Sequence, residues 1–156
     1  MEKENAIIEF WNTFLKETNR DANLKYYDCF YFGHTEELAN ELLKLVLKGN
    51  KKATSSSRYA FEIEKQSLPR VGDFNIVTDW DGLPYCVIET TNVIVLPFKE
   101  MTYDICKREG EDDNLESWQK GHIKFFTEDG KETGYTFTED MPIVFEDFEV
   151  VYALEY

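Results

Sequence analysis

The sequence predicts a single α+β domain in which a curved, largely antiparallel sheet or β-barrel is flanked by helices. Three observations lead to this prediction. The chain has 156 residues, the length of one ordinary domain that can bury a core. Aromatic residues make up 15% of it, a content that suits a core rich in strands. Helical patterns come first, strand patterns follow, and a helical insert interrupts the strands, an order typical of α+β domains.

Four segments have the pattern of a helix. Residues 3–18 place apolar side chains at three- and four-residue spacing, which forms one buried stripe. A second helix begins after Thr35, a good N-cap, and ends at Gly49, because glycine tolerates the left-handed conformation found after many helices. A short helix is expected over 101–109. The fourth predicted helix ends before a turn at Asp129-Gly130. Its apolar stripe consists of Leu115, Trp118, His122 and Phe125.

Extended segments are predicted from β-rich composition and from alternation of apolar and polar residues. The alternation over 74–80 is typical of a half-buried strand, and Asp81-Gly82 after it is a hairpin-turn signal. The segment 85–98 is either one long strand or a bent pair. The remaining expectations are a short aromatic segment at 26–34, a strand at 53–64, a loop at 67–73, an acidic break at 110–114, a strand or loop at 136–141 and a closing strand at 148–156.

Composition excludes several classes of protein. The longest apolar run, 93–96, is far too short to span a bilayer, and the first residues lack the pattern of a signal peptide. The three cysteines are scattered without CxxC spacing, so neither a disulfide framework nor a zinc site is indicated. The two histidines have no partners at ligand spacing. We therefore expect a cytoplasmic protein with reduced thiols, no metal, no cofactor and no membrane contact, and the oligomeric state is left open.

Charge restricts the partners. Acidic residues outnumber basic ones 31 to 17, which gives a net charge of −14. A protein that coats long RNA or DNA needs a basic surface, and the only dense basic segment here runs from Lys48 to Arg58. This turn is also rich in hydroxyls, so a polar binding site made of Gly49, Ser55, Ser56 and Arg58 is one interpretation. The other is a solvated helix end, where lysines meet exposed carbonyl groups.

Aromatic side chains supply candidates for contact with a base. Tyr27, Phe30 and Trp80 can stack on a base face, an interaction that contributes ~1–3 kcal/mol per base in single-strand binders. The alternative is that these side chains close over a core. His122, between aromatic residues on a helix, is interpreted as a core histidine with one hydrogen-bonded nitrogen.

Three short motifs occur in order along the chain. The first runs from Phe32-Gly33 through the second helix to Gly49-Asn50-Lys51, the second is the segment 68–73, and the third is the segment 106–111 followed by Trp118 and His122. Together they resemble the ASCH domain family, over residues 25–156, with residues 1–20 as an added N-terminal helix. The resemblance implies a β-barrel related to the PUA RNA-binding domains and one domain over 1–156.

The resemblance also implies alternative functions. One is binding of RNA or of a nucleotide or modified nucleoside in a barrel cleft. Some small members are amidohydrolases that deacetylate N-acetylated cytidine with a Lys, a Thr and a Glu, which correspond here to Lys51, Thr54 and Glu109. Other members are reported to cleave RNA, and a regulatory module without a ligand is a further alternative. The family motif often has an Arg where this chain has Ser56, and Arg58 follows two positions later.

Amide hydrolysis needs a nucleophile, a base and a group that manages the proton of the leaving amine. Thr54 is the candidate nucleophile, Lys51 the base and Glu109 its partner, with Glu111 competing for the last role. Side chains three apart in a regular strand point to opposite faces. Lys51 and Thr54 can therefore share a site only if Lys51 lies on a turn and Thr54 at the start of a strand.

Overall fold

The computed structural model describes residues 2–154 and divides into two compact units. Unit 1 contains residues 2–49, 72–89 and 149–154, and unit 2 contains residues 50–71 and 90–148. Strands β4 (Pro84–Pro97) and β5 (Pro142–Ala153) contribute residues to both units. The five strands are hydrogen-bonded in the order β1-β3-β4-β5-β2.

Unit 1 is built around an aromatic core between a helix and three strands. Its other elements are α1 (Glu2–Glu17), β1 (Asp28–Phe30), α2 (Glu36–Leu47) and β3 (Phe74–Thr78). β1 pairs with β3 in parallel, and β3 pairs with β4 in antiparallel orientation. The apolar stripe of α1 supplies Phe10, Trp11 and Phe14, which pack with Phe74 and Ile76 of β3. The stripe predicted from sequence is therefore the inner face of α1.

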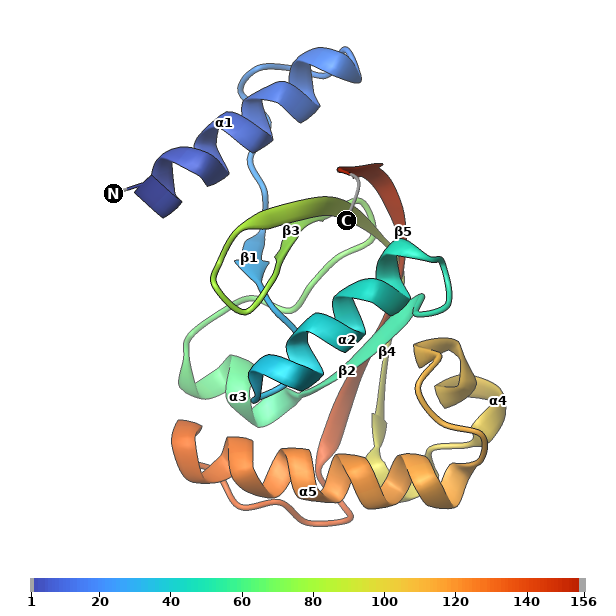
Figure 1. Cartoon of the computed structure of the whole chain (residues 1–156). Coiled ribbons are helices and arrows are strands. Elements are labelled where there is room, and N and C mark those ends of the chain that lie inside the picture. The colour runs from blue at the N-terminus through green and yellow to red at the C-terminus, as the bar shows by residue number, and fades with distance from the viewer. Residues whose placement is uncertain (1, 155–156) are drawn as a thin grey trace. The chain divides into compact units, whose positions relative to one another are not determined.

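Unit 2 carries the remaining helices and the antiparallel pair of β2 with β5. Its elements are β2 (Ala53–Ser57), α3 (Arg58–Ile63), the 3₁₀ turns η1 (Phe98–Glu100) and η2 (Lys107–Glu109), α4 (Tyr103–Cys106) and α5 (Leu115–Thr133). Trp118 and Phe126 of α5 pack with Phe98 and with Phe145 of β5 in its core. Figure 1 shows α3 and α5 side by side in this unit.

Local signals predicted several elements correctly. The Thr35 side chain accepts a hydrogen bond from the Leu38 N–H at 3.2 Å and caps α2. Gly49 follows α2 with φ of 80°, a left-handed conformation. The segment 85–98 is one strand, and the turn after β3 is closed by a hydrogen bond from the Leu83 N–H to the Asp79 carboxylate at 2.9 Å.

Three sequence-based predictions are wrong, each for a physical reason. The strand predicted over 53–64 stops at Ser57, because the Ser57 hydroxyl accepts from the Tyr59 N–H at 3.1 Å and caps α3. The predicted turn at Asp129-Gly130 lies inside α5; a Cβ on Gly130 would lie 2.3 Å from the Tyr135 carbonyl, so this glycine lets the chain return against the helix. The segment 74–80 was predicted as a half-buried strand, but all five residues of β3 are buried, because β3 lies between β1 and β4 in the sheet.

The C-terminal segments differ in extent from the prediction. β5 starts at Pro142, before the expected position 148, whereas residues 136–141 form a loop, one of the two predicted alternatives. Tyr156, which was included in the closing strand, lies outside the described residues. Within residues 2–154, no helix combines the length and apolar character that crossing a bilayer requires.

Candidate functional site

Lys51 lies between α2 and β2, and its side chain is directed into unit 2. The residue is 2% exposed. Its ammonium donates to the Ala53 carbonyl at 2.8 Å and to Glu111 Oε2 at 2.6 Å, and it lies 3.7 Å from Glu109 Oε1. This lysine is therefore an internal cation that contacts two carboxylates, and it adds little positive charge to the surface.

Gly110 explains how both carboxylates reach Lys51. Its φ of 73° is in the left-handed region, and a Cβ there would lie 2.0 Å from the Asn50 carbonyl oxygen. The Lys52 N–H donates to the Arg108 carbonyl at 3.0 Å, which joins η2 to the segment before β2. Only glycine allows this backbone approach, because any side chain would overlap Asn50.

Glu109 is the centre of a buried hydrogen-bonded network. Its Oε2 accepts from Ser55 Oγ at 2.9 Å and from Trp118 Nε1 at 2.5 Å, and its Oε1 lies 3.3 Å from His122 Nε2. Burial alone would raise the pKa of Glu109, but His122, Lys51 and the Trp118 N–H outweigh it and lower the pKa to about 2. The carboxylate is therefore ionised, and its lone pairs are already occupied by protein donors.

Glu111 differs from Glu109 in accessibility. Its side chain is 20% exposed, against 2% for Glu109, although it makes the shorter contact with the Lys51 ammonium. Of the two carboxylates next to Lys51, Glu111 is the one that solvent reaches. Solvent also reaches the network at His122, whose side chain is 13% exposed, so Glu111 is the more accessible of these two residues.

His122 has hydrogen-bond partners at both ring nitrogens. Nδ1 lies 2.9 Å from the Trp118 carbonyl, and Nε2 faces Glu109. The imidazole also stacks on the Trp118 ring at 4.2 Å. Burial alone would lower the pKa of His122, but the charge and hydrogen bond of Glu109, with Glu111 and the Trp118 carbonyl, raise it above its ordinary value. The expectation of one hydrogen-bonded nitrogen is wrong, because the buried carboxylate is within reach of the second.

Thr54 is the second residue of β2 and points away from this network. Ser55 contacts Glu109, and neighbouring side chains in a strand point to opposite faces. Thr54 therefore shares the other face with Glu146, its partner across the β2–β5 pair. Glu146 Oε2 accepts from Thr90 Oγ1 at 2.5 Å on that face. Ser56, which follows the same alternation, is also on that face.

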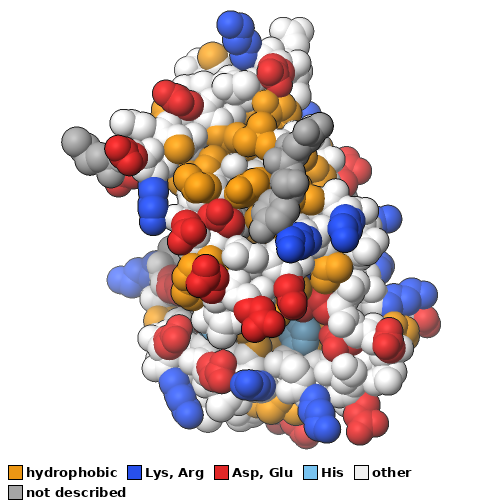
Figure 2. Space-filling model, in the orientation of Figure 1, with side chains coloured by type: hydrophobic (Ala, Val, Ile, Leu, Met, Phe, Trp, Pro, Cys, Tyr) orange, Lys and Arg blue, Asp and Glu red, His pale blue; other side chains and the backbone are white. Residues whose placement is uncertain are grey.

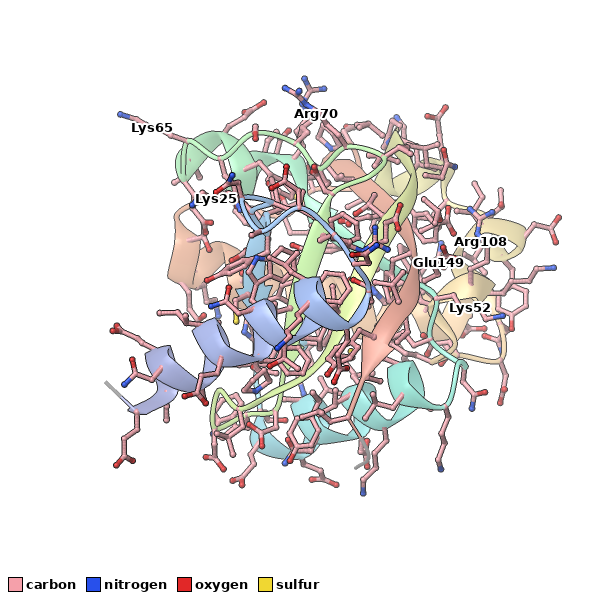
Figure 3. The ribbon with its side chains drawn as sticks, turned by 90° about the horizontal axis from the view of Figure 1, so that it is seen from above. Lys25, Lys52, Lys65, Arg70, Arg108 and Glu149 are labelled. Carbon is pink, nitrogen blue, oxygen red and sulfur yellow. The ribbon has the colours of Figure 1, made fainter. Side chains whose placement is uncertain are left out.

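The basic residues of the predicted site do not converge. Arg58 begins α3, is exposed, and lies 3.6 Å from Glu62 in an ion pair along that helix. Figure 3 shows Lys52 beside Arg108, whereas Lys65 and Arg70 project from another part of unit 2. Gly49 belongs to the end of α2 in unit 1. The basic turn of the sequence is thus divided between a buried lysine and separate exposed cations.

The aromatic candidates all belong to unit 1. The Tyr27 N–H donates to the Phe74 carbonyl at 2.7 Å. Phe30 packs edge-on against Phe32, with the ring centroids 5.0 Å apart, and Trp80 packs against Tyr31 at 4.8 Å. Each of the three has a packing or backbone role within its own unit.

Sequence reasoning missed two members of the network. Trp118 and His122 were assigned to the apolar face of a helix, yet both direct nitrogen atoms at Glu109. The available signal was their spacing, because residues four apart on a helix point the same way and both side chains have a polar edge. Within residues 2–154, no cluster of His, Cys, Asp and Glu suits a metal ion.

Comparisons with known proteins identify the family. The ASCH domain model matches residues 28–152. The structure of an ASCH domain from Lactobacillus crispatus JV V101 is similar, with 35% identity and a TM-score of 0.83 over 97% of this chain and 96% of that one. Protein EF3133 from Enterococcus faecalis V583 has 32% identity and a TM-score of 0.87 over 94% and 88%, respectively. No curated protein matches the chain.

These findings confirm the resemblance and the fold class predicted from sequence. The mixed α+β arrangement, with a five-stranded, curled, barrel-like sheet and flanking helices, is that of the ASCH structures. ASCH domains have a PUA-like fold that is often linked to RNA binding. The chain belongs to the ASCH domain family.

Proposed function

We propose that this ASCH domain binds a small nucleoside-like ligand at the pair formed by Lys51 and Glu111. The observation that carries the proposal is the 2.6 Å contact between a buried ammonium and a carboxylate whose side chain is 20% exposed. The contact with Lys51 fixes the position of the Glu111 carboxylate, whose accessible oxygen can accept hydrogen bonds from a ligand. Carboxylates accept from the exocyclic amino group of cytosine in known protein–nucleic acid contacts.

The charge distribution favours a small ligand over long RNA. Two carboxylates contact the buried Lys51 ammonium, so this cation is not available to a phosphate, and the exposed Arg58 has Glu62 beside it. Figure 2 shows acidic and basic side chains interspersed on the visible face, without a continuous basic area. With a net charge of −14, we expect weak binding to long RNA, which falls further as salt rises.

A binding experiment tests the proposal. Cytidine, uridine and N-acetylated cytidine are titrated into the wild type, Glu111→Gln and the control Glu116→Gln, which changes an exposed carboxylate on α5. A hydrogen bond to a charged group contributes about 1.5–3 kcal/mol, so Glu111→Gln should weaken binding about 10-fold to 100-fold. Glu116→Gln should leave the affinity unchanged. Equal affinities for all three proteins would contradict the proposed site.

RNA binding is tested separately with a short single strand at several salt concentrations. The proposal expects weak binding that decreases with salt, since any contribution would come from exposed cations such as Lys52 and Arg108. A tight complex that is insensitive to salt would replace the nucleoside proposal by an RNA-binding function.

We propose hydrolysis of an N-acylated nucleoside as the second candidate. It is favoured by the direct contact between Lys51 and Glu111 next to a strand that carries the hydroxyls of Thr54 and Ser55. In this mechanism Thr54 Oγ1 attacks the acyl carbonyl, and its proton passes through Lys51 with Glu109 or Glu111 to the nitrogen of the leaving amine as the C–N bond breaks. Water then hydrolyses the acyl ester on Thr54, which releases the acid and regenerates the hydroxyl. We rank it second because strand alternation directs Thr54 to the face opposite Ser55.

The hydrolase candidate has its own assay. N-acetylated cytidine is incubated with the wild type, Thr54→Ala and Ser55→Ala, and deacetylation is followed by absorbance. Loss of turnover only in Thr54→Ala supports the nucleophile named above. Loss only in Ser55→Ala would assign that role to the hydroxyl on the Glu109 face, and absence of turnover in the wild type removes this activity for this substrate.

A further inference from the structure

The ring of His122 lies between two groups that accept hydrogen bonds. Nδ1 is 2.9 Å from the Trp118 carbonyl oxygen, and Nε2 is 3.3 Å from Glu109 Oε1. A carbonyl and an ionised carboxylate can only accept, so both ring nitrogens satisfy their partners only when both carry a proton. Either neutral tautomer would place a nitrogen lone pair against an oxygen lone pair.

Protonation of Glu109 instead of His122 is disfavoured by the other donors around this carboxylate. Ser55 Oγ and Trp118 Nε1 both donate to Oε2, and the Lys51 ammonium lies 3.7 Å from Oε1. A carboxylate that accepts several hydrogen bonds and contacts a cation is stabilised in its ionised form. The proton between Glu109 and His122 is therefore bound to the imidazole of His122.

Two carboxylates act on His122, and both of them contact the Lys51 ammonium. Glu109 comes from η2, Glu111 from the segment after it, and Lys51 from the segment before β2. On α5 itself the ring contacts the aromatic side chains of Trp118 and Phe126. With an imidazolium, two cations balance two carboxylates in this network.

We infer that His122 is a positioning residue, whose imidazolium neutralises Glu109 and thereby leaves the Lys51 ammonium paired with Glu111. The distances agree with this division, because Lys51 lies 2.6 Å from Glu111 Oε2 but 3.7 Å from Glu109 Oε1. When His122 loses its proton, Lys51 is the remaining cation beside Glu109. The ammonium is then drawn towards Glu109, and Glu111 is no longer held in place.

The consequence for a ligand depends on the proposed function. If a nucleoside binds to Glu111, its affinity decreases as pH rises through the pKa of His122, because the carboxylate loses the contact that fixes its position. The protonation state itself is a property of the protein alone and can be measured without any ligand.

The protonation state is measured by NMR of the imidazole groups in the full chain. The protein contains only two histidines, so the His34→Gln variant assigns both signals. We expect His122 to carry protons on both nitrogens at neutral pH and to titrate above the ordinary range near 6.5. A His122 signal that is neutral at pH 6.5 overturns the inference.

A second variant tests whether Glu109 is the group that raises the pKa of His122. Glu109→Gln should lower the His122 midpoint by more than about one pH unit, since it removes the charge next to Nε2. Glu116→Gln is the control and should leave the midpoint unchanged. An unchanged midpoint in folded Glu109→Gln contradicts the inference, and the wild-type titration remains decisive where this variant does not fold.

The positioning role is read from the pH dependence of binding. The dissociation constant of cytidine should rise about tenfold in the wild type across the His122 titration. In His122→Asn it should be independent of pH over that range. Equal pH dependence in both proteins overturns the role. If no nucleoside binds while the imidazole titrates as expected, the proposed function is wrong and the assignment of the imidazolium is supported.

Discussion

Replacing Glu109 by glutamine removes the charge at the centre of the buried network in unit 2. In the wild type this carboxylate accepts from Ser55 and Trp118 and contacts the cations Lys51 and His122. A glutamine keeps one acceptor oxygen, but in either orientation its amide hydrogens face other donors, either Ser55 and Trp118 or the two cations. Removing one partner of a buried ionic network costs about 3–5 kcal/mol, because the opposite charges stay buried without compensation.

The lowered pKa of Glu109 leads to an expected pH dependence of stability. The pKa of Glu109 is lowered from 4.5 to about 2, which corresponds to about 3 kcal/mol at neutral pH. A lowered folded-state pKa means that this stabilisation is fully present above the unfolded value near 4.5. It is lost as pH falls through about 2, where the folded carboxyl takes up its proton. The difference between the wild type and Glu109→Gln should therefore shrink over this window.

Urea denaturation followed by tryptophan fluorescence measures the difference at pH 7, 5 and 3. We expect about 3–5 kcal/mol at pH 7 and 5 and a smaller value at pH 3. The exposed Glu116→Gln should remain within about 0.5 kcal/mol of the wild type at each pH. A loss below about 1 kcal/mol at pH 7, or a difference that does not change with pH, would refute the role assigned to Glu109.

Three further substitutions, with one control, test the contacts that stabilise unit 2. Gly110→Ala should destabilise the fold by more than about 2 kcal/mol in urea denaturation, whereas Gly121→Ala, in open space on α5, should stabilise it by up to about 1 kcal/mol. Trp118→Phe keeps most of the packing but removes a donor to a buried carboxylate, so a loss of about 1–3 kcal/mol is expected in the same assay. Ser57→Ala removes the cap of α3 and should cost about 1 kcal/mol by thermal denaturation.

The parts of the fold that could be predicted from sequence are those set by local interactions. The helix between Thr35 and Gly49 has both of its end signals within the segment, and the hairpin after β3 contains its own turn residues. The end of β2 could not be predicted, because the serines suit either a strand or a helix cap. Gly130 was misassigned to a turn since its contact, the Tyr135 carbonyl, follows the helix that contains it.

The candidate site was predictable only in part, for a related reason. The family resemblance indicated Lys51, Thr54 and Glu109, with Glu111 competing for the role of Glu109. The structure brings Lys51 into contact range of both carboxylates but directs Thr54 to the other face of β2. The contributions of Trp118 and His122 depend on how α5 packs against η2, and no local pattern in the sequence determines this packing. The direction of Thr54 likewise depends on which strand face meets α5.

The two carboxylates on either side of Gly110 have different environments, so their replacement should have different effects on stability and on the proposed ligand binding. Glu109 is buried and meets four protein groups, whereas Glu111 is partly exposed and meets Lys51. Glu111→Gln should therefore destabilise the protein less than Glu109→Gln in urea denaturation, because Glu111 is partly solvated and Lys51 keeps Glu109 nearby, while nucleoside affinity falls. Equal losses of stability in Glu111→Gln and Glu109→Gln would mean that both carboxylates serve the fold, and the proposed binding role of Glu111 would then lack its physical basis.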